Sequence, residues 1–117
     1  MAEVDREWLA SELRRLLLAV ASPGEAALEH APAGSCRPDE LALDHENFAR
    51  ALVAAFASEL SDPQRRALLH VDELLGAMSG PHQAELWTEA AVVGQPRWAE
   101  VRRAAQQALD ALSWRPA

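Results

Sequence analysis

Four stretches of this sequence place apolar residues three or four positions apart, the spacing of a helix that buries one face. A strand would instead alternate apolar and polar residues, and no stretch shows that alternation convincingly. The sequence therefore predicts an all-α fold. The apolar positions are Leu9, Leu13, Leu16 and Val20, then Phe48, Leu52, Phe56 and Leu60, then Leu68, Val71, Leu75 and Met78, and finally Trp98, Val101, Ala105, Ala108 and Leu112.

Proline, glycine and capping residues divide these stretches into separate helices. The Ser-Asp-Pro step at 61–63 is a capping residue followed by a proline for a first helical turn. Ser22 stands three residues before Glu25, which is the spacing of a capping box at the start of a short second helix. The start of the next helix stays open between Asp39, which follows a proline, and Asp44, which is itself a good cap.

The length of 117 residues fits one domain that has its own core and needs no disulfide or metal to fold. We expect a single helical domain over residues 1–117, in which about five helices pack nearly antiparallel as a bundle. An acidic irregular segment is expected around residues 22–43. Gly76 falls inside the helix predicted over residues 63–78, where it marks either fraying or a close contact between helices.

The formal net charge is −7, and no basic run exceeds two residues. A nucleic-acid-binding protein usually presents a basic face to the phosphates, so binding to nucleic acid or to an anionic membrane is not expected. The chain opens on the acidic sequence MAEVDREW, and the apolar run 16–21 is far too short to cross a bilayer. We therefore expect a soluble, cytoplasmic protein. All basic residues are arginine, which is typical of a GC-rich bacterial genome.

The segment from Glu29 to Asn47 holds the single cysteine, Cys36, together with His30 and His45. A zinc site needs Cys and His in local pairs, and the sequence HENFA lacks the second histidine of a helical zinc motif. A Cys-His nucleophile would need an imidazole within hydrogen-bond reach of the thiol, and no family signature surrounds Cys36. We predict no metal and no cofactor.

Arg65 and His70 are separated by four residues in RRALLH. This spacing resembles the R-x4-6-H motif of the HEPN-type ribonucleases, which are small helical domains. The resemblance covers six residues, and Arg66 replaces the Asn, Asp or His that commonly follows the arginine in that family. It implies that Arg65 would bind or polarise phosphate, that His70 would act in acid–base cleavage, and that a dimer would join two sites.

The favoured function is non-enzymatic binding of a basic protein partner. Residues 25–46 contain six acidic residues and only one arginine. Irregular segments on a rigid scaffold often carry binding function, and acidic side chains there complement a basic partner. In charge and fold class such a chain is similar to toxin-neutralising immunity proteins. The alternatives are the ribonuclease and a self-associating structural protein; the sequence does not fix the oligomeric state. Residues expected at the partner surface are Glu25, Glu29, Asp39, Glu40, Asp44, Glu46 and Trp114, whereas Trp87 and Trp98 are expected in the core.

Overall fold

The helices begin and end where the sequence interrupts its apolar pattern. The computed structural model describes residues 6–114. The sequence predicts a first helix over residues 4–21, of which residues 4 and 5 lie outside the described residues. Within this range there is no strand, and no helix is both long and apolar enough to cross a membrane. The all-α prediction is confirmed. The elements are α1 (Arg6–Val20), α2 (Gly24–Leu28), α3 (Arg37–Ala55), α4 (Asp62–Ala77), the 3-10 helix η1 (Ala84–Trp87), α5 (Glu89–Gly94) and α6 (Pro96–Ala111).

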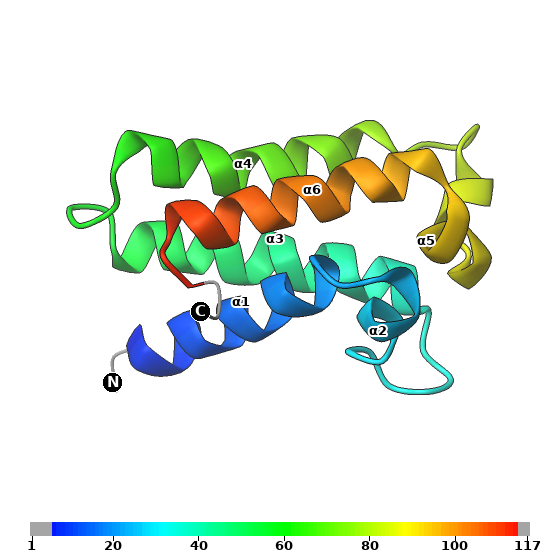
Figure 1. Ribbon diagram of the computed structural model, residues 1–117, viewed down its shortest axis with the longest axis horizontal. Helices are drawn as coiled ribbons and strands as arrows, with labels where there is room; N and C mark the ends of the chain where they lie inside the picture. The colour runs from blue at the N-terminus through cyan, green and yellow to red at the C-terminus, as the bar shows by residue number, and fades with distance from the viewer. Residues whose placement is uncertain (1–5, 115–117) are drawn as a thin grey trace.

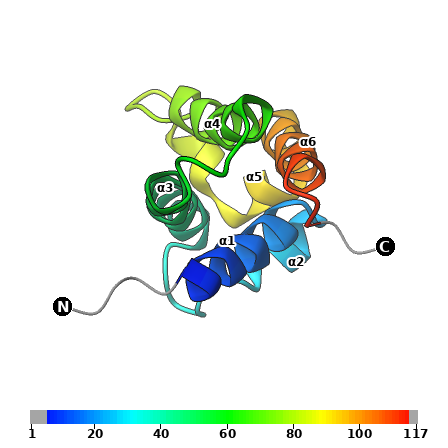
Figure 2. The same ribbon diagram turned by 90° about the vertical axis from the view of Figure 1, so that its left-hand side faces the viewer.

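The four long helices form a bundle in which each runs opposite to the next along the chain (Figure 1). Seen from its end, the bundle has α1, α3, α4 and α6 around a common centre (Figure 2). The short elements α2, η1 and α5 lie together at one end, where α2 packs on α5 and α5 packs on α6. The radius of gyration is 13.9 Å, close to the value of about 13 Å for a compact chain of this length.

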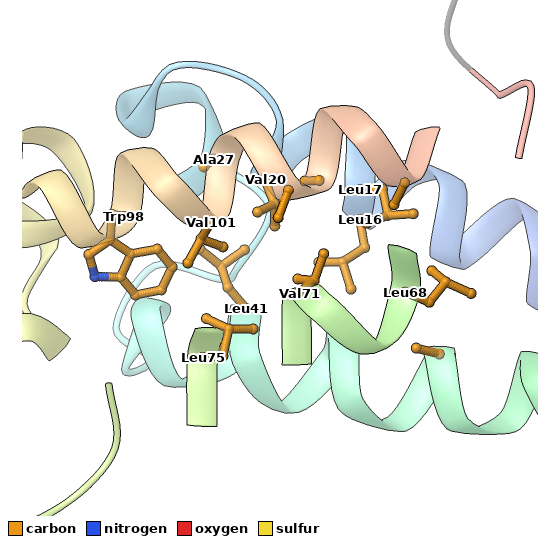
Figure 3. Close-up of a cluster of buried hydrophobic side chains, with 14 of the residues drawn as sticks. Leu16, Leu17, Val20, Ala27, Leu41, Leu68, Val71, Leu75, Trp98 and Val101 are labelled. Carbon is orange, nitrogen blue, oxygen red and sulfur yellow. The ribbon is translucent and has the colours of Figure 1, made fainter. Parts of the chain in front are cut away.

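Leucine, valine and alanine side chains fill the centre of the bundle. Leu16 and Leu17 of α1, Val71 of α4 and Val101 of α6 are fully buried and point toward one another (Figure 3). The buried face of α6 also carries three alanines, whose small side chains let α1 and α4 pack closely against it. Leu16, Val71 and Val101 come from the predicted apolar stripes, whereas Leu17 lies beside its stripe. The stripes locate the long helices, but the one through Phe56 and Leu60 predicts too late an end for α3, which stops at Ala55.

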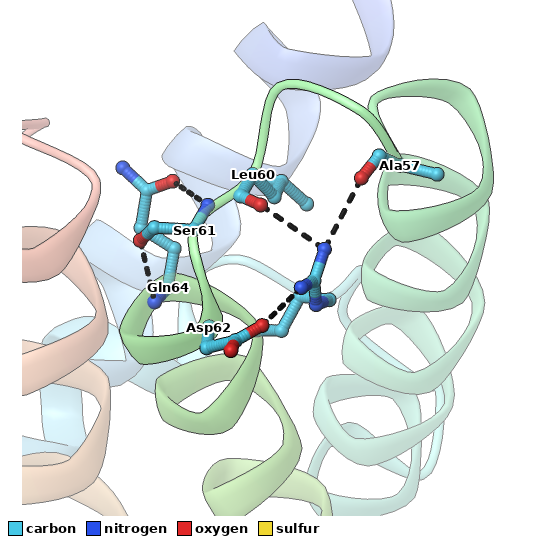
Figure 4. Close-up of polar contacts among 6 residues, drawn as sticks. Ala57, Leu60, Ser61, Asp62 and Gln64 are labelled. Atoms are coloured by element: carbon cyan, nitrogen blue, oxygen red, sulfur yellow. Dashed lines mark hydrogen bonds and ion pairs between the residues drawn. The ribbon is translucent and has the colours of Figure 1, made fainter.

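The predicted cap at Ser61 is confirmed, and the predicted cap at Ser22 is wrong. The Ser61 hydroxyl accepts a hydrogen bond from the Gln64 backbone N–H at 3.3 Å, and the Gln64 side chain accepts one from the Ser61 N–H at 2.9 Å (Figure 4). The Ser22 hydroxyl instead donates to the Leu18 carbonyl at 2.6 Å. It therefore satisfies the end of α1, and α2 begins after Pro23 without a side-chain cap.

The irregular acidic segment is shorter than the sequence predicts. Pro38 occupies the first turn of α3, where its missing N–H costs nothing, and α3 therefore begins at Arg37. The earlier of the two predicted starts, beside Asp39, is thus the right one. With α2 covering 24–28, the irregular chain between these helices is reduced to residues 29–36.

Gly24 of α2 and Gly76 of α4 differ in their surroundings. Gly76 does not allow a close contact between helices, because a Cβ there would have no neighbouring atom within 4 Å. It is the last residue but one of α4, which ends at Ala77. Gly24 is the position that needs its small size. A Cβ on Gly24 would lie 2.6 Å from the Val93 Cα and 2.7 Å from the Val92 carbonyl oxygen. Gly24 therefore sets how closely α2 approaches α5.

Candidate functional site

The seam between α3 and α4 is open. These two helices pack against each other less extensively than the other neighbouring pairs of long helices do, and a groove of about 950 Å³ lies between them. Fourteen residues separate Asp39 from Val53 along the groove, which corresponds to about 21 Å of helix. Residues at every third or fourth position line this groove: Asp39, Leu43, Glu46, Arg50 and Val53 from α3, and Arg65, Leu69, Asp72 and Gly76 from α4.

The groove presents apolar surface to solvent. Leu43 is 52% exposed and Leu69 is 55% exposed, although both line the groove. Neither leucine belongs to the apolar stripe that its helix buries in the core. Leu68 and Leu75, which also line the groove, are buried. Exposed large apolar side chains that line one groove and are rimmed by charge are typical of a binding surface.

The charges along the groove are unevenly compensated. Glu46 accepts a hydrogen bond from Arg50 at 2.7 Å, and Arg65 forms an ion pair with Asp62. Among residues 6–114, no arginine pairs with Asp39 or Asp72. Carboxylates without an arginine partner among the described residues therefore lie in the middle of the groove and toward the end where α3 begins.

Asp72 is joined to a histidine from the other wall of the groove. The Asp72 Oδ1 atom lies 2.6 Å from Nδ1 of His45, whose side chain is 0% exposed, while Asp72 keeps 29% of its side chain exposed. Because a carboxylate only accepts, His45 donates through Nδ1. The His45 Nε2 atom is buried, and no described residue forms a hydrogen bond with it. Sequence reasoning missed this pair because 27 residues separate its members.

Cys36 is held as a thiol. The side chain is exposed, and its Sγ donates a hydrogen bond to Oδ2 of Asp39 at 3.1 Å. This hydrogen bond to the protonated form, with smaller contributions from desolvation and from the negative charge of Asp39, raises the pKa of Cys36 above its ordinary value. The two nearby histidines pair elsewhere, His30 with Asp44 at 3.3 Å and His45 with Asp72. In the described part of the chain, no group of three or more Cys, His, Asp or Glu side chains is placed to hold a metal ion.

Replacing Asp39 with asparagine is expected to make Cys36 react several-fold faster with iodoacetamide at pH 8. The substitution replaces the carboxylate that accepts the thiol's hydrogen bond by a weaker, neutral acceptor and also removes its negative charge, so the pKa of Cys36 falls and the thiolate fraction rises. Mass spectrometry of quenched samples gives the rate. Asp44→Asn is the matched control, since Asp44 pairs with His30 and should leave the rate unchanged. An equal rate in Asp39→Asn and the wild type would contradict this assignment.

The structure does not bring Arg65 and His70 together. Arg65 Nη1 donates to the carbonyl oxygens of Ala57 at 3.1 Å and of Leu60 at 3.0 Å, where it holds the turn between α3 and α4 (Figure 4). His70 lies half-exposed, with its Nδ1 3.9 Å from Oε2 of Glu73. No hydrogen bond or ion pair between Arg65 and His70 occurs within residues 6–114.

The predicted acidic surface is divided by helix geometry. Asp39 and Glu46 are seven residues apart, share one face of α3 and line the groove. Glu40 and Asp44 lie about 100° and 140° around the helix from Asp39, and Asp44 reaches His30 beyond α2. Glu25 and Glu29 are exposed at α2, outside the groove. Two of the six predicted acidic residues thus belong to the groove.

The tryptophans occupy three different settings. Trp98 is buried in the core, as predicted, while Trp87 is half-buried, packs edge-on to Trp98 at 5.5 Å and lines the end of the groove. Trp114 is half-buried against the core, and its carbonyl accepts a hydrogen bond from Arg14 Nε at 3.1 Å. It therefore packs back onto the bundle and lies outside the groove.

The groove thus combines two straight helical walls, exposed leucines and two carboxylates without an arginine partner among the described residues. These features provide apolar contact and acceptors for a cation. Comparison of the chain with protein-family models, with curated proteins and with solved structures found no match in any of the three.

Proposed function

We propose that this chain is a non-enzymatic protein-binding module that holds an amphipathic helix of a basic partner protein in the groove between α3 and α4. The observation that carries the proposal is the open seam with its exposed leucines. Two neighbouring helices form a trough whose lining side chains recur every three or four residues, and a third helix can pack into it with matching ridges. The length of about 21 Å corresponds to about four helical turns.

The apolar contacts favour binding through the burial of Leu43 and Leu69. Each is about half exposed in the free chain, so covering it contributes about 1 kcal/mol, half the value for a fully transferred leucine. Val53 and Trp87 also line the groove and extend the apolar surface along it. An apolar stripe on the incoming helix is therefore the first requirement for a partner.

The charges favour a basic partner. Asp39 and Asp72 are not offset by an arginine of the described chain, and the whole chain carries a net charge of −7. Such a surface attracts a cationic helix during diffusion and repels an acidic one. The ribonuclease alternative receives less support, because the Arg65 guanidinium already serves the turn between α3 and α4.

The test selects binders from a display library of helix-forming peptides about four turns long, with the full chain as bait. Bound peptides are then titrated by fluorescence polarisation against the wild type and Leu69→Glu. We expect affinity to fall about 30-fold or more in Leu69→Glu, which replaces an apolar contact by a charge. Ala51→Glu is the matched control. It adds the same charge to an exposed position of α3 outside the groove and should preserve affinity.

Three outcomes would overturn the proposal. One is the absence of any selected peptide, and another is equal affinity for the wild type and Leu69→Glu. The third is a wild-type dimer in light scattering at micromolar concentration that Leu69→Glu converts to a monomer, because the groove would then hold a second copy of the chain. Circular dichroism of each variant verifies that the exposed substitutions leave the helices intact.

A further inference from the structure

We propose that Asp72 recognises a cationic side chain, arginine or lysine, of the bound helix, and that His45 is the residue that positions Asp72 for this role. The inference rests on the proposed function, because it concerns the chemistry of the helix in the same groove. The inference goes beyond the proposed function because it names the residue that selects the partner. Asp72 lines the middle of the groove, one turn from Leu69 and one turn from Gly76.

The surroundings of Asp72 leave room for a ligand. Gly76 has no side chain, and a Cβ at that position would have no neighbouring atom within 4 Å. The carboxylate offers about four acceptor sites, of which the hydrogen bond from His45 Nδ1 uses one. The arginines of the groove are engaged elsewhere, Arg50 with Glu46 and Arg65 with Asp62. A cation from a partner therefore meets no competing arginine pair at Asp72 within residues 6–114.

Burying the polar ring of His45 in the core costs folding free energy. Its ring is fully buried on the core face of α3, between Leu41 and Ala49 one turn away on either side. The Nε2 atom has no hydrogen-bond partner within residues 6–114, and Nδ1 makes the ring's hydrogen bond to Asp72. An apolar side chain of similar size would fill this part of the core without an unsatisfied polar atom. The role that remains for the imidazole ring is its hydrogen bond to Asp72.

The effect of His45 on Asp72 is orientation. A carboxylate on a helix surface samples several rotamers, and binding a cation must select one of them. The short hydrogen bond from a fully buried ring fixes Oδ1 before the partner arrives. Fixing an acceptor in advance reduces the entropic cost of recognition and sharpens the choice between a cationic and a neutral side chain.

The test uses a peptide whose binding depends on Leu69, obtained by the selection described above, and a copy in which its arginine is replaced by the neutral isostere citrulline. A lysine is replaced by norleucine in the same way. We expect the wild type to prefer the cationic peptide about tenfold, and Asp72→Asn to remove that preference. Full coupling between the two changes in a double-mutant cycle identifies Asp72 as the recognition residue.

His45→Met separates positioning from a structural role. We expect its urea midpoint to equal or exceed that of the wild type, while most of the preference for the cationic peptide is lost. A His45→Met variant that is less stable and keeps the preference, or that does not fold, would show that His45 is structural. Asp72→Asn, which changes a partly exposed group, still tests recognition in that case.

The proposed function and this inference fail in different ways. If binding depends on Leu69 but the selected peptides carry no cation, or the coupling to Asp72 is below about twofold, the inference is wrong and the groove still binds helices. If binding is indifferent to Leu69→Glu, the proposed function is wrong and the inference falls with it.

Discussion

Replacement of Trp98 by alanine is expected to lower the free energy of unfolding by about 3 to 5 kcal/mol, because a buried indole leaves a large cavity. Trp98 is 4% exposed, and its Nε1 donates to the Leu86 carbonyl at 2.6 Å. The same ring packs edge-on against Trp87, which lines the end of the groove. The substitution therefore also removes the support of that end of the groove.

Urea denaturation followed by circular dichroism measures this loss. Trp98→Phe is the control, since it keeps most of the apolar volume and removes the hydrogen bond to Leu86. Its cost is expected to be smaller, about 1 to 3 kcal/mol for a buried carbonyl left without its donor and a partly filled cavity. A Trp98→Ala variant with the urea midpoint of the wild type would contradict the place of this residue in the core.

The same substitution, glycine to alanine, is expected to have opposite effects at two helical positions. Gly24→Ala should destabilise the fold by about 3 kcal/mol, because its Cβ would overlap the backbone of Val93 and force α2 away from α5. Gly76→Ala should stabilise it by about 0.5 to 1 kcal/mol, because α4 gains a better helix former in open space.

Thermal and urea unfolding of the two variants side by side provide the measurement. Each variant is the control for the other, since both add one methyl group inside a helix. A Gly24→Ala variant as stable as the wild type would mean that α2 and α5 do not pack as closely as described. A less stable Gly76→Ala variant would mean that the space beside Gly76 is filled.

The parts of the fold that can be predicted from the sequence are those set by neighbouring residues, namely the positions of the long helices and the start of α4. The apolar stripe through Leu13 and Leu16 locates α1, and Ser61 with its proline locates the start of α4, because both depend on neighbours within one or two turns. Ser22 misleads because a serine between two helices can bond to either one. It bonds to the Leu18 carbonyl at the end of α1.

The groove depends on contacts between helices, which periodicity does not report. Asp39 and Glu46 are predicted at a binding surface and do line the groove, but Asp72 is not among the residues predicted there. A signal was present in Leu43 and Leu69, which are leucines outside the core stripes of their helices. His45 gave another, since it interrupts the apolar face that contains Leu41 and Ala49.

Hydrogen bonds hold the chain segments at both ends of the groove. At one end Arg65 donates to the Ala57 and Leu60 carbonyls across the turn, and at the other the Trp87 Nε1 donates to the Met78 carbonyl at 2.9 Å. The turn that joins the two walls and the η1 segment at the other end are therefore held in place by the fold before anything docks there. The conformational entropy lost on binding is then mainly that of the partner segment, which must become helical. The groove itself already has the shape that it keeps in the complex.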